Sequence, residues 1–398
     1  MHLSQLVRSI EEPATLAMSR RARELRGEGK DIISLSLGEP DHAPLPKLLD
    51  AAREALNGAW HTYPPVNGYQ DVREAISMKL ERDNGLNYAP EQIVVSTGAK
   101  QSVMNVVLAL AGPGDEVVIP APYWVTYAEQ VRIAGATPIV VPSSIDEDFK
   151  APIERISAAI TPRTRLLMYS SPCNPSGSVL TRGELEQLAE VVRHHPDLLV
   201  LSDEIYEHIV FEGGHVSLAS LPGMMDRTIT VNGLSKAFAL TGWRVGYLAA
   251  PLELAKACST IQGQFTSGTN GIAQRVTKAC MELDPVELAP MRADFLRRRD
   301  LVVSGLRKIP GWRCNVPQGA FYALPDVSAW IGRSHQGRVL SNTSELCMAL
   351  LEEAGVSLVD GDAFGAPGTL RISYAADDRS LTTALDRIRQ FGENLTTA

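Results

Sequence analysis

The stretch 228–246 carries a lysine that could do covalent chemistry. It reads T-I-T-V-N-G-L-S-K-A-F-A-L-T-G-W-R-V-G, so a β-branched run is followed by Ser235, Lys236 and Arg244. Apolar residues 237–240 follow the lysine, and burial among such neighbours lowers the pKa of an amine below its usual ~10.4. Because only the neutral amine attacks a carbonyl, a desolvated lysine at a strand end favours Schiff-base chemistry. A lysine that snorkels from a helix is the alternative.

Asp203 and Tyr206 follow another apolar run, 198–202. A carboxylate at the end of such a run would be buried, and a buried carboxylate needs a cationic or hydrogen-bonded partner. A protonated pyridine nitrogen is such a partner, whereas a helix N-cap is the competing role for Asp203. Tyr206 lies one turn further on and could donate a hydrogen bond to an oxygen of the same ring.

Three more apolar runs precede residues that suit a flat, phosphorylated ligand. Gly98, Ala99 and Lys100 begin a helix, where backbone N–H groups and the helix dipole suit a phosphate. Trp124 could stack on a ring, and the amide of Asn174 could donate to a phenolic oxygen. Taken singly these signals are weak, because a strand-to-helix turn, a core tryptophan and an N-P-x-G turn explain them as well.

Arg371 lies in the run L-R-I-S-Y (370–374), where alternation places it on the face opposite Leu370 and Ile372. A guanidinium is a bidentate fork for a carboxylate, so Arg371 is a candidate for binding a substrate α-carboxylate. A surface salt bridge is the alternative. Together these signals are strong, because all of the groups follow predicted strands. They comprise a phosphate-binding turn, an aromatic residue that can stack on a ring, two donors for a ring oxygen, an acid for a ring nitrogen and an amine.

The elements that must position these residues are predicted by the apolar rhythm. Continuous apolar runs alternate with helical stretches from residue 91 onward, and they occupy 93–97, 116–120, 137–141, 165–169, 198–202, 228–231 and 245–249. Such runs indicate a largely parallel sheet that is buried on both faces, with helices around it. Ligands bind outside the carboxyl ends of the strands of such a sheet. The fold class is therefore α/β, with a seven-stranded sheet in a large domain.

A smaller α+β domain is predicted after residue 285. It contains helices at 286–308, 343–354 and 380–391 and strands at 320–324 and 370–374. The predicted division is an N-terminal segment 1–45 that packs with the small domain, a large domain 46–285 and a small domain 286–398. Arg297, Arg298 and Arg299 are interpreted as a solvated helix face.

Composition excludes several other classes of protein. The 398 residues include 44% hydrophobic and 21% charged residues with a net charge of −8, which does not favour nucleic acid or an anionic membrane. Five scattered cysteines argue for a reducing compartment and against a disulfide framework or a zinc site. There is no signal peptide and no apolar run of ~20 residues. These features predict a cytoplasmic enzyme without a metal.

The chain resembles the class I, fold-type I aminotransferases, which use pyridoxal 5′-phosphate. The resemblance runs from Pro13 to residue 390 and is most specific in S-D-E-I-Y-E-H (202–208), V-N-G-L-S-K-A-F-A-L-T-G-W-R-V-G-Y (231–247) and L-R-I-S-Y-A (370–375). Within the family it looks most like bacterial and plastid aspartate aminotransferases that also act on prephenate, on G-A-K-Q-S (98–102), A-P-Y-W-V-T-Y (121–127) and P-Q-G-A-F-Y (317–322).

The resemblance implies a role for each matching residue. Lys236 would form the internal aldimine and move the proton between Cα and C4′, while Asp203 would keep the pyridine nitrogen protonated. The other implied roles are ring contacts by Trp124, Asn174 and Tyr206, phosphate binding by Gly98, Ala99, Lys100, Ser235 and Arg244, and α-carboxylate binding by Gly38 and Arg371. Tyr63 would reach the phosphate of a neighbouring subunit, which implies a homodimer with shared active sites.

The resemblance also implies transamination between aspartate or glutamate and 2-oxo acids, namely 2-oxoglutarate, oxaloacetate or prephenate, by a ping-pong mechanism. Lys100 would hold the distal carboxylate, although an exposed first-turn lysine is the alternative. Thr15 and Lys100 match the prephenate-competent members, whereas the stretch 60–68 and Cys173 depart from the family pattern. An aromatic or neutral amino acid aminotransferase is the alternative function. A lyase or synthase of the same fold and a ligand-sensing regulator are further alternatives.

Overall fold

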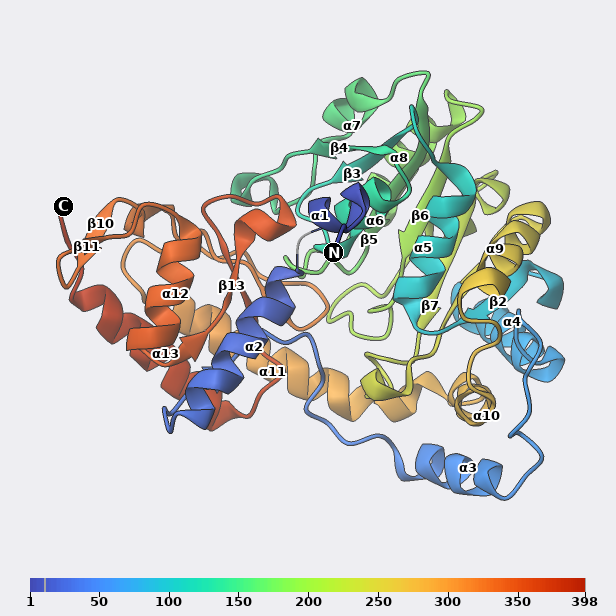
Figure 1. Ribbon diagram of the computed structural model, residues 1–398, viewed down its shortest axis with the longest axis horizontal. Coiled ribbons are helices and arrows are strands. Elements are labelled where there is room, and N and C mark those ends of the chain that lie inside the picture. The colour runs from blue at the N-terminus through green and yellow to red at the C-terminus, as the bar shows by residue number, and fades with distance from the viewer. Residues whose placement is uncertain (11, 398) are drawn as a thin grey trace.

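A seven-stranded, mostly parallel sheet organises the larger part of the molecule (Figure 1). The computed structural model describes residues 1–10 and 12–397. The strand order is β2-β8-β7-β6-β5-β3-β4, and the only antiparallel neighbours within this described sheet are those of β8. The strands are β2 (Ile93–Ser96), β3 (Glu116–Pro120), β4 (Thr137–Val141), β5 (Thr164–Ser170), β6 (Leu199–Asp203), β7 (Thr228–Gly233) and β8 (Gly246–Ala249). The predicted seven-stranded α/β fold is confirmed.

The sheet is buried on both faces because its strands are apolar at consecutive positions. In β5, Leu166 and Met168 belong to one hydrophobic cluster, whereas Leu167 and Tyr169 belong to another. Alternate side chains of a strand point to opposite faces, so each face of β5 has its own core. The helices of this part are α3 (Pro46–Leu56), α4 (Gln70–Asn84), α5 (Ala99–Leu110), α6 (Thr126–Ile133), α7 (Ile153–Ala159), α8 (Arg182–Arg193), α9 (Leu252–Phe265) and α10 (Gly271–Met281).

One edge of the sheet collects residues that the sequence predicts for the site. The parallel strands β2, β5, β6 and β7 end there, and the loops that follow them carry Gly98, Asn174, Tyr206 and Lys236. Strand β8 runs antiparallel to β7, so its start lies at the same edge, and Arg244 lies two residues before that start. Residues from five strand ends therefore meet in one place.

The C-terminal part packs with the N-terminal segment. Helix α2 (Ala14–Gly27) lies beside this part in Figure 1, and β1 (Ile33–Ser34) pairs in parallel with β12 (Val356–Ser357). Strand β14 (Leu370–Ser373) pairs antiparallel with β13 (Val359–Asp360) and β9 (Tyr322–Ala323). The remaining helices and strands are α1 (Gln5–Ser9), α11 (Ala289–Leu306), α12 (Thr343–Glu353), α13 (Asp378–Glu393), β10 (Arg333–His335), β11 (Arg338–Val339) and β15 (Thr396–Thr397). None of the described helices is long and apolar enough to cross a membrane.

Helix α11 corrects one interpretation made from the sequence. Arg297 is exposed, but Arg298 and Arg299 are each only 7% exposed, so the solvated-face interpretation is wrong for these two. The guanidinium of Arg298 forms ion pairs with Asp41 at 2.7 Å and Asp294 at 2.9 Å. These contacts compensate the burial of the charge, which runs of charged residues in a sequence do not reveal.

Candidate active site

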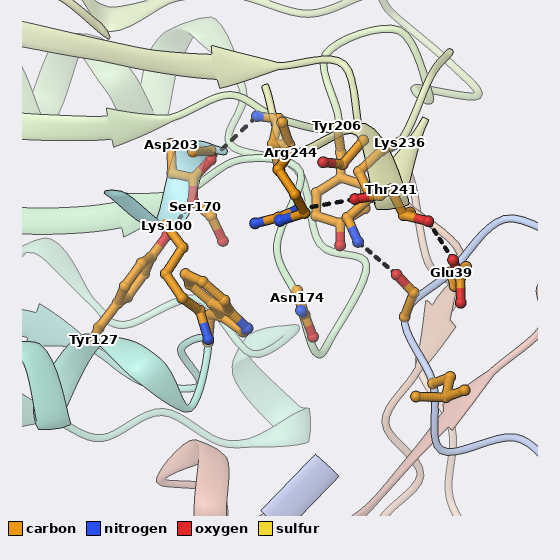
Figure 2. A pocket seen from close by; sticks show the side chains of 16 residues that line it. Glu39, Lys100, Tyr127, Ser170, Asn174, Asp203, Tyr206, Lys236, Thr241 and Arg244 are labelled. Carbon is orange, nitrogen blue, oxygen red and sulfur yellow. Dashed lines mark hydrogen bonds between the residues drawn. The ribbon is translucent and has the colours of Figure 1, made fainter. Parts of the chain in front are cut away.

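A cavity lies at the sheet edge where the strand ends meet, and Figure 2 shows side chains that line it. The described residues that line it come from the strand ends and from the N-terminal segment: Leu37, Gly38, Glu39, Ala99, Lys100, Trp124, Tyr127, Ser170, Asn174, Asp203, Ile205, Tyr206, Ser235, Lys236, Thr241 and Arg244. Ten of the residues predicted from the sequence are thus in one place.

Lys236 points into this cavity from the loop that follows β7. Its ammonium donates a hydrogen bond to the carbonyl oxygen of Gly38 at 2.5 Å, across from the N-terminal segment. Burial, with the charge of Arg371 as the next largest cause, lowers the pKa of Lys236 to about 8. A substantial share of the amine is therefore neutral near pH 8, which is the nucleophilic form. The snorkelling alternative is wrong for Lys236.

Asp203 faces the same cavity from the last position of β6. Its Oδ2 accepts a hydrogen bond from the Tyr127 hydroxyl at 2.7 Å, and its Oδ1 accepts one from the backbone N–H of Ile205 at 3.2 Å. Burial raises the pKa of Asp203 to about 6. Residues 205–208 form a turn, so the helix N-cap alternative is wrong. A cation placed against this carboxylate would keep it ionised.

An anion-binding corner lies where α5 begins. Gly98 has a φ of +84°, and a Cβ at that position would lie 2.4 Å from Nη2 of Arg244, so a side chain there would displace the guanidinium. The first backbone N–H groups of α5 have no acceptor within the helix. Arg244 donates from Nη1 to the carbonyl oxygen of Thr241 at 2.9 Å, and Ser235 lines the same corner. Together these donors suit a phosphate.

Lys100, which Figure 2 labels, and Trp124 also line the cavity. The Lys100 ammonium lies 4.9 Å from the centroid of the Trp124 ring, which is within cation–π range. Desolvation in the cavity and the charge of Arg244 lower the pKa of Lys100. Lys100 is exposed on the first turn of α5 and also lines the cavity, so its position is compatible with the predicted role and with that of an exposed first-turn lysine.

Arg371 lies behind the cavity and does not line it. Its side chain is 2% exposed, and it donates to Oδ1 of Asn174 at 3.0 Å and to the carbonyl oxygen of Ser36 at 2.5 Å. Its guanidinium lies 4.7 Å from the ring centroid of Tyr322 and 4.9 Å from that of Phe364. The Nε atom has no hydrogen-bond partner among the described residues. The surface salt bridge is therefore wrong, and Arg371 is a buried cation that touches a cavity residue.

Two predicted residues lie away from the cavity. Tyr63 is 94% exposed, and Thr15 is half-buried on α2; neither lines the cavity within the described chain. Conversely, the predictions made from the sequence missed Tyr127, Thr241 and Glu39. The motif A-P-Y-W-V-T-Y contains Tyr127 one helical turn after Trp124, and that spacing is the signal that could have found it.

The fold and the site together define a class of enzyme, and comparisons with known proteins agree. A family model for class I and II aminotransferases matches residues 30–388, so the chain belongs to this family and is an aminotransferase. It is 46% identical over 393 residues to the bifunctional aspartate aminotransferase and glutamate/aspartate-prephenate aminotransferase of Petunia hybrida, covering 98% of this chain and 82% of that protein.

Other relatives carry related names. The chain is 43% identical to an aspartate/prephenate aminotransferase of Cereibacter sphaeroides, over 98% of both chains. The crystal structure of the aspartate aminotransferase from Rhizobium meliloti superposes with a TM-score of 0.96 at 38% identity and covers 100% of both chains.

The cofactor of this family is pyridoxal 5′-phosphate, and the residues of this cavity fit it. The Gly98 corner suits its phosphate, Asp203 suits a protonated ring nitrogen, and the buried Ser170 hydroxyl has no hydrogen-bond partner among the described residues. When bound, the cofactor supplies an aldehyde that accepts an amino group and a ring that withdraws electrons.

Proposed function

We propose that this aminotransferase transfers amino groups between aspartate or glutamate and 2-oxo acids, with 2-oxoglutarate, oxaloacetate and prephenate as acceptors. One observation carries the proposal: the Lys100 ammonium reaches the cavity that also holds Lys236 and Asp203. An amino acid with two carboxylates needs a second cation besides Arg371, and Lys100 provides it. The names of the relatives support the same substrates, and a Thermus thermophilus aspartate aminotransferase with maleate is 38% identical, with a TM-score of 0.92 and 98% of this chain covered.

The chemistry in this proposal rests on Lys236 and Asp203. Lys236 would hold the cofactor through its amine and would carry the proton that leaves the substrate Cα. Its lowered pKa leaves enough neutral amine to accept that proton. Asp203 stays ionised against the ring nitrogen and holds a proton there, while Tyr127 keeps the carboxylate oriented. The amino group is taken up in one half-reaction and released in the second, as a ping-pong mechanism requires.

The remaining predicted residues bind and orient in this proposal. Tyr206 and Asn174 donate to the ring oxygen, and Trp124 stacks on the ring. The backbone around Gly98, Ala99 and Lys100 holds the phosphate together with the side chains of Ser235 and Arg244. Arg371 and Gly38 bind the α-carboxylate, and the Nε of Arg371, which has no partner among the described residues, is one available donor. For Thr15 the cavity offers no supporting contact, and its role stays a prediction.

The assembly is a further part of the proposal. We infer a homodimer because Tyr63 is 94% exposed on a loop whose backbone is held by other elements: Gln262 donates to the carbonyl oxygen of Val66 at 2.7 Å. A large exposed ring on a fixed loop suits a contact with a second copy, whose phosphate corner it would reach. The division into 1–45, 46–285 and 286–398 and the cytoplasmic location likewise stay predictions.

A second candidate function is the transamination of aromatic or other neutral amino acids. An aromatic aminotransferase of Pyrococcus horikoshii is 36% identical, with a TM-score of 0.85 and 93% of this chain covered. Mixing the cofactor-bound protein with single amino acids and recording its absorption separates the candidates. Aspartate and glutamate are expected to convert the spectrum to that of the pyridoxamine form. Conversion by phenylalanine or methionine alone would contradict the acidic-substrate proposal.

The role of Lys100 is tested by a paired rate measurement. We expect Lys100→Ala to lower kcat/KM for oxaloacetate and prephenate by roughly tenfold to a hundredfold, because each loses one charge-assisted hydrogen bond. Lys256→Ala, an exposed lysine on α9, is the matched control and should match the wild type. Losses below about tenfold on both acceptors would remove Lys100 from the distal-carboxylate role.

A further inference from the structure

Tyr322 is a fully buried tyrosine that no role described above uses. It lies on β9, in the C-terminal part, where Tyr322 pairs with Ser373 of β14. Its hydroxyl lies 2.8 Å from the hydroxyl of Tyr206, and either oxygen can be the donor. Tyr206 lines the cavity, whereas Tyr322 stands directly behind it. The second tyrosine is therefore in hydrogen-bond contact with a proposed cofactor contact.

The same side chain also touches the proposed α-carboxylate site. The ring of Tyr322 lies 4.7 Å from the guanidinium carbon of Arg371, within cation–π range. A Cβ at Gly38 would lie 2.2 Å from the Tyr322 hydroxyl oxygen, so this hydroxyl occupies the space that a side chain at position 38 would need. Tyr322 thus contacts residues on both the cofactor side and the substrate side of the cavity.

We propose that Tyr322 is a positioning residue with two separable parts: its hydroxyl orients the Tyr206 hydroxyl toward the ring oxygen of the cofactor, and its ring holds the Arg371 guanidinium in place for the α-carboxylate. The proposal rests on the proposed function of the site. It goes beyond that function because it assigns the coupling between the two binding regions to one side chain of β9.

The number of hydroxyl protons on the two tyrosines decides which of them donates to the other. Each tyrosine hydroxyl has one proton, so when Tyr206 donates to the cofactor its oxygen is left to accept a hydrogen bond. Tyr322 is the hydroxyl that reaches it, and that makes Tyr322 the donor. Hydrogen bonds in such a chain strengthen one another in a buried site. Removing the hydroxyl of Tyr322 should therefore weaken the donation from Tyr206 to the ring oxygen.

The first test uses Tyr322→Phe, which keeps the ring and deletes the hydroxyl. A weaker donor leaves the ring oxygen more basic, so the pH midpoint of the absorption band of the bound cofactor should rise by roughly 0.5–1 unit. We expect kcat with aspartate to fall by roughly 3- to 10-fold, while KM for aspartate stays within about twofold.

The second test uses Tyr322→Leu, which also removes the ring under Arg371. In this variant KM for aspartate should rise by roughly 2- to 30-fold, because the loss of one cation–π contact corresponds to a change of that size. The effect on kcat should remain as in Tyr322→Phe. Tyr374→Phe is the matched control, because the buried Tyr374 hydroxyl donates to the carbonyl oxygen of Ala320 at 3.4 Å and lies outside the cavity lining. Its spectrum and KM should equal those of the wild type.

The outcomes separate this inference from the proposed function. A midpoint that moves no further in Tyr322→Phe than in Tyr374→Phe overturns the role of the hydroxyl. A KM that rises equally in Tyr322→Phe and Tyr322→Leu overturns the role of the ring. A wild-type protein that shows the cofactor band but does not convert it with any amino acid overturns the proposed function instead, while the midpoint comparison still decides the hydroxyl's role.

Discussion

Two regions with buried charge lie close to β6, and they differ in how the charge is satisfied. Behind the sheet edge, Lys79 is 2% exposed and forms an ion pair with Glu207, which also accepts a hydrogen bond from Asn232 at 2.8 Å. In the cavity, Lys236 donates to a carbonyl oxygen and Asp203 accepts from a tyrosine and a backbone amide. The first region neutralises its charges within the chain, and the second does not.

The pKa values record this difference. Burial alone would raise the pKa of Glu207, but the charges of Lys79, His208 and His215 lower it below the usual value. In the cavity, burial dominates, raising the pKa of Asp203 to about 6 and lowering that of Lys236 to about 8. We infer that the compensated charges around Glu207 are structural and that the uncompensated ones in the cavity await a ligand. This contrast leads to the following predictions.

The largest expected effect is on catalysis by Lys236→Ala. Removing the amine should lower the rate of transamination between aspartate and 2-oxoglutarate by roughly 10⁴-fold or more, because both the covalent contact and the proton carrier are lost. Steady-state rates at saturating substrate measure this loss. Lys79→Met is the comparison, and its folded fraction should keep a rate close to that of the wild type. An equal loss of rate in both variants would contradict the distinction between the two regions.

The carboxylates give the next largest effect. Asp203→Asn keeps an acceptor for Tyr127 but no longer holds the ring-nitrogen proton, so kcat should fall by roughly 10²- to 10⁴-fold. Glu207→Gln should change kcat little and lower stability instead. The two variants are compared by kcat and by urea unfolding. An intact rate in Asp203→Asn would show that the cavity carboxylate is structural like Glu207.

Stability should change in opposite directions when the two lysines are replaced. Lys79→Met should lower the free energy of unfolding by about 3–5 kcal/mol, because it leaves Glu207 buried and unpaired. Lys236→Met should raise it by about 1–3 kcal/mol in the cofactor-free protein at pH 7, since an amine with a lowered pKa costs stability wherever the unfolded chain is protonated. Urea unfolding at pH 7 measures both. Changes of the same sign would contradict the comparison.

The smallest effects are expected in the pH dependence of stability. A lowered pKa makes Glu207 stabilising above the unfolded value of ~4.3, and that contribution is lost as the pH falls through its folded pKa. Asp203 has a raised pKa of about 6, so it costs stability above pH 6, and the cost is relieved as the pH falls toward ~3.9. Between pH 7 and 4 the cofactor-free wild type should therefore gain about 1–3 kcal/mol relative to Asp203→Asn. A constant difference would mean that Asp203 is not perturbed.

Much of the sheet could be predicted from the sequence because its signals are local. The apolar runs at 116–120 and 137–141 coincide with β3 and β4 at both ends. Strand β7 extends two residues beyond the predicted run, to Gly233, because Asn232 and Gly233 pair with Tyr247 and Gly246 of β8. Pairing with β8 therefore determined where β7 ends, which local composition did not specify.

In the site, too, some features could be predicted from the sequence and others could not. Lys236, Asp203 and Lys100 were predicted because each follows a strand of a parallel sheet, and such ends share one edge. The hydrogen bond from Tyr127 to Asp203 and the contacts of Tyr322 with Tyr206 and Arg371 were not predicted. The spacing from Trp124 points to Tyr127 as a cavity residue, but it does not reveal the partners of these side chains, because their proximity depends on how helices and the C-terminal part pack on the sheet.

The sequence by itself determined the order of the strands along the chain, the chemical groups at their ends and the family, because apolar periodicity and motif residues are local properties. Only the tertiary structure decided which charges are compensated. Lys79 and Lys236 are both lysines largely withdrawn from water, yet one meets a carboxylate from a distant loop and the other a carbonyl oxygen. The electrostatic energy of a buried charge depends on distances to groups far away in the chain, and folding alone sets those distances.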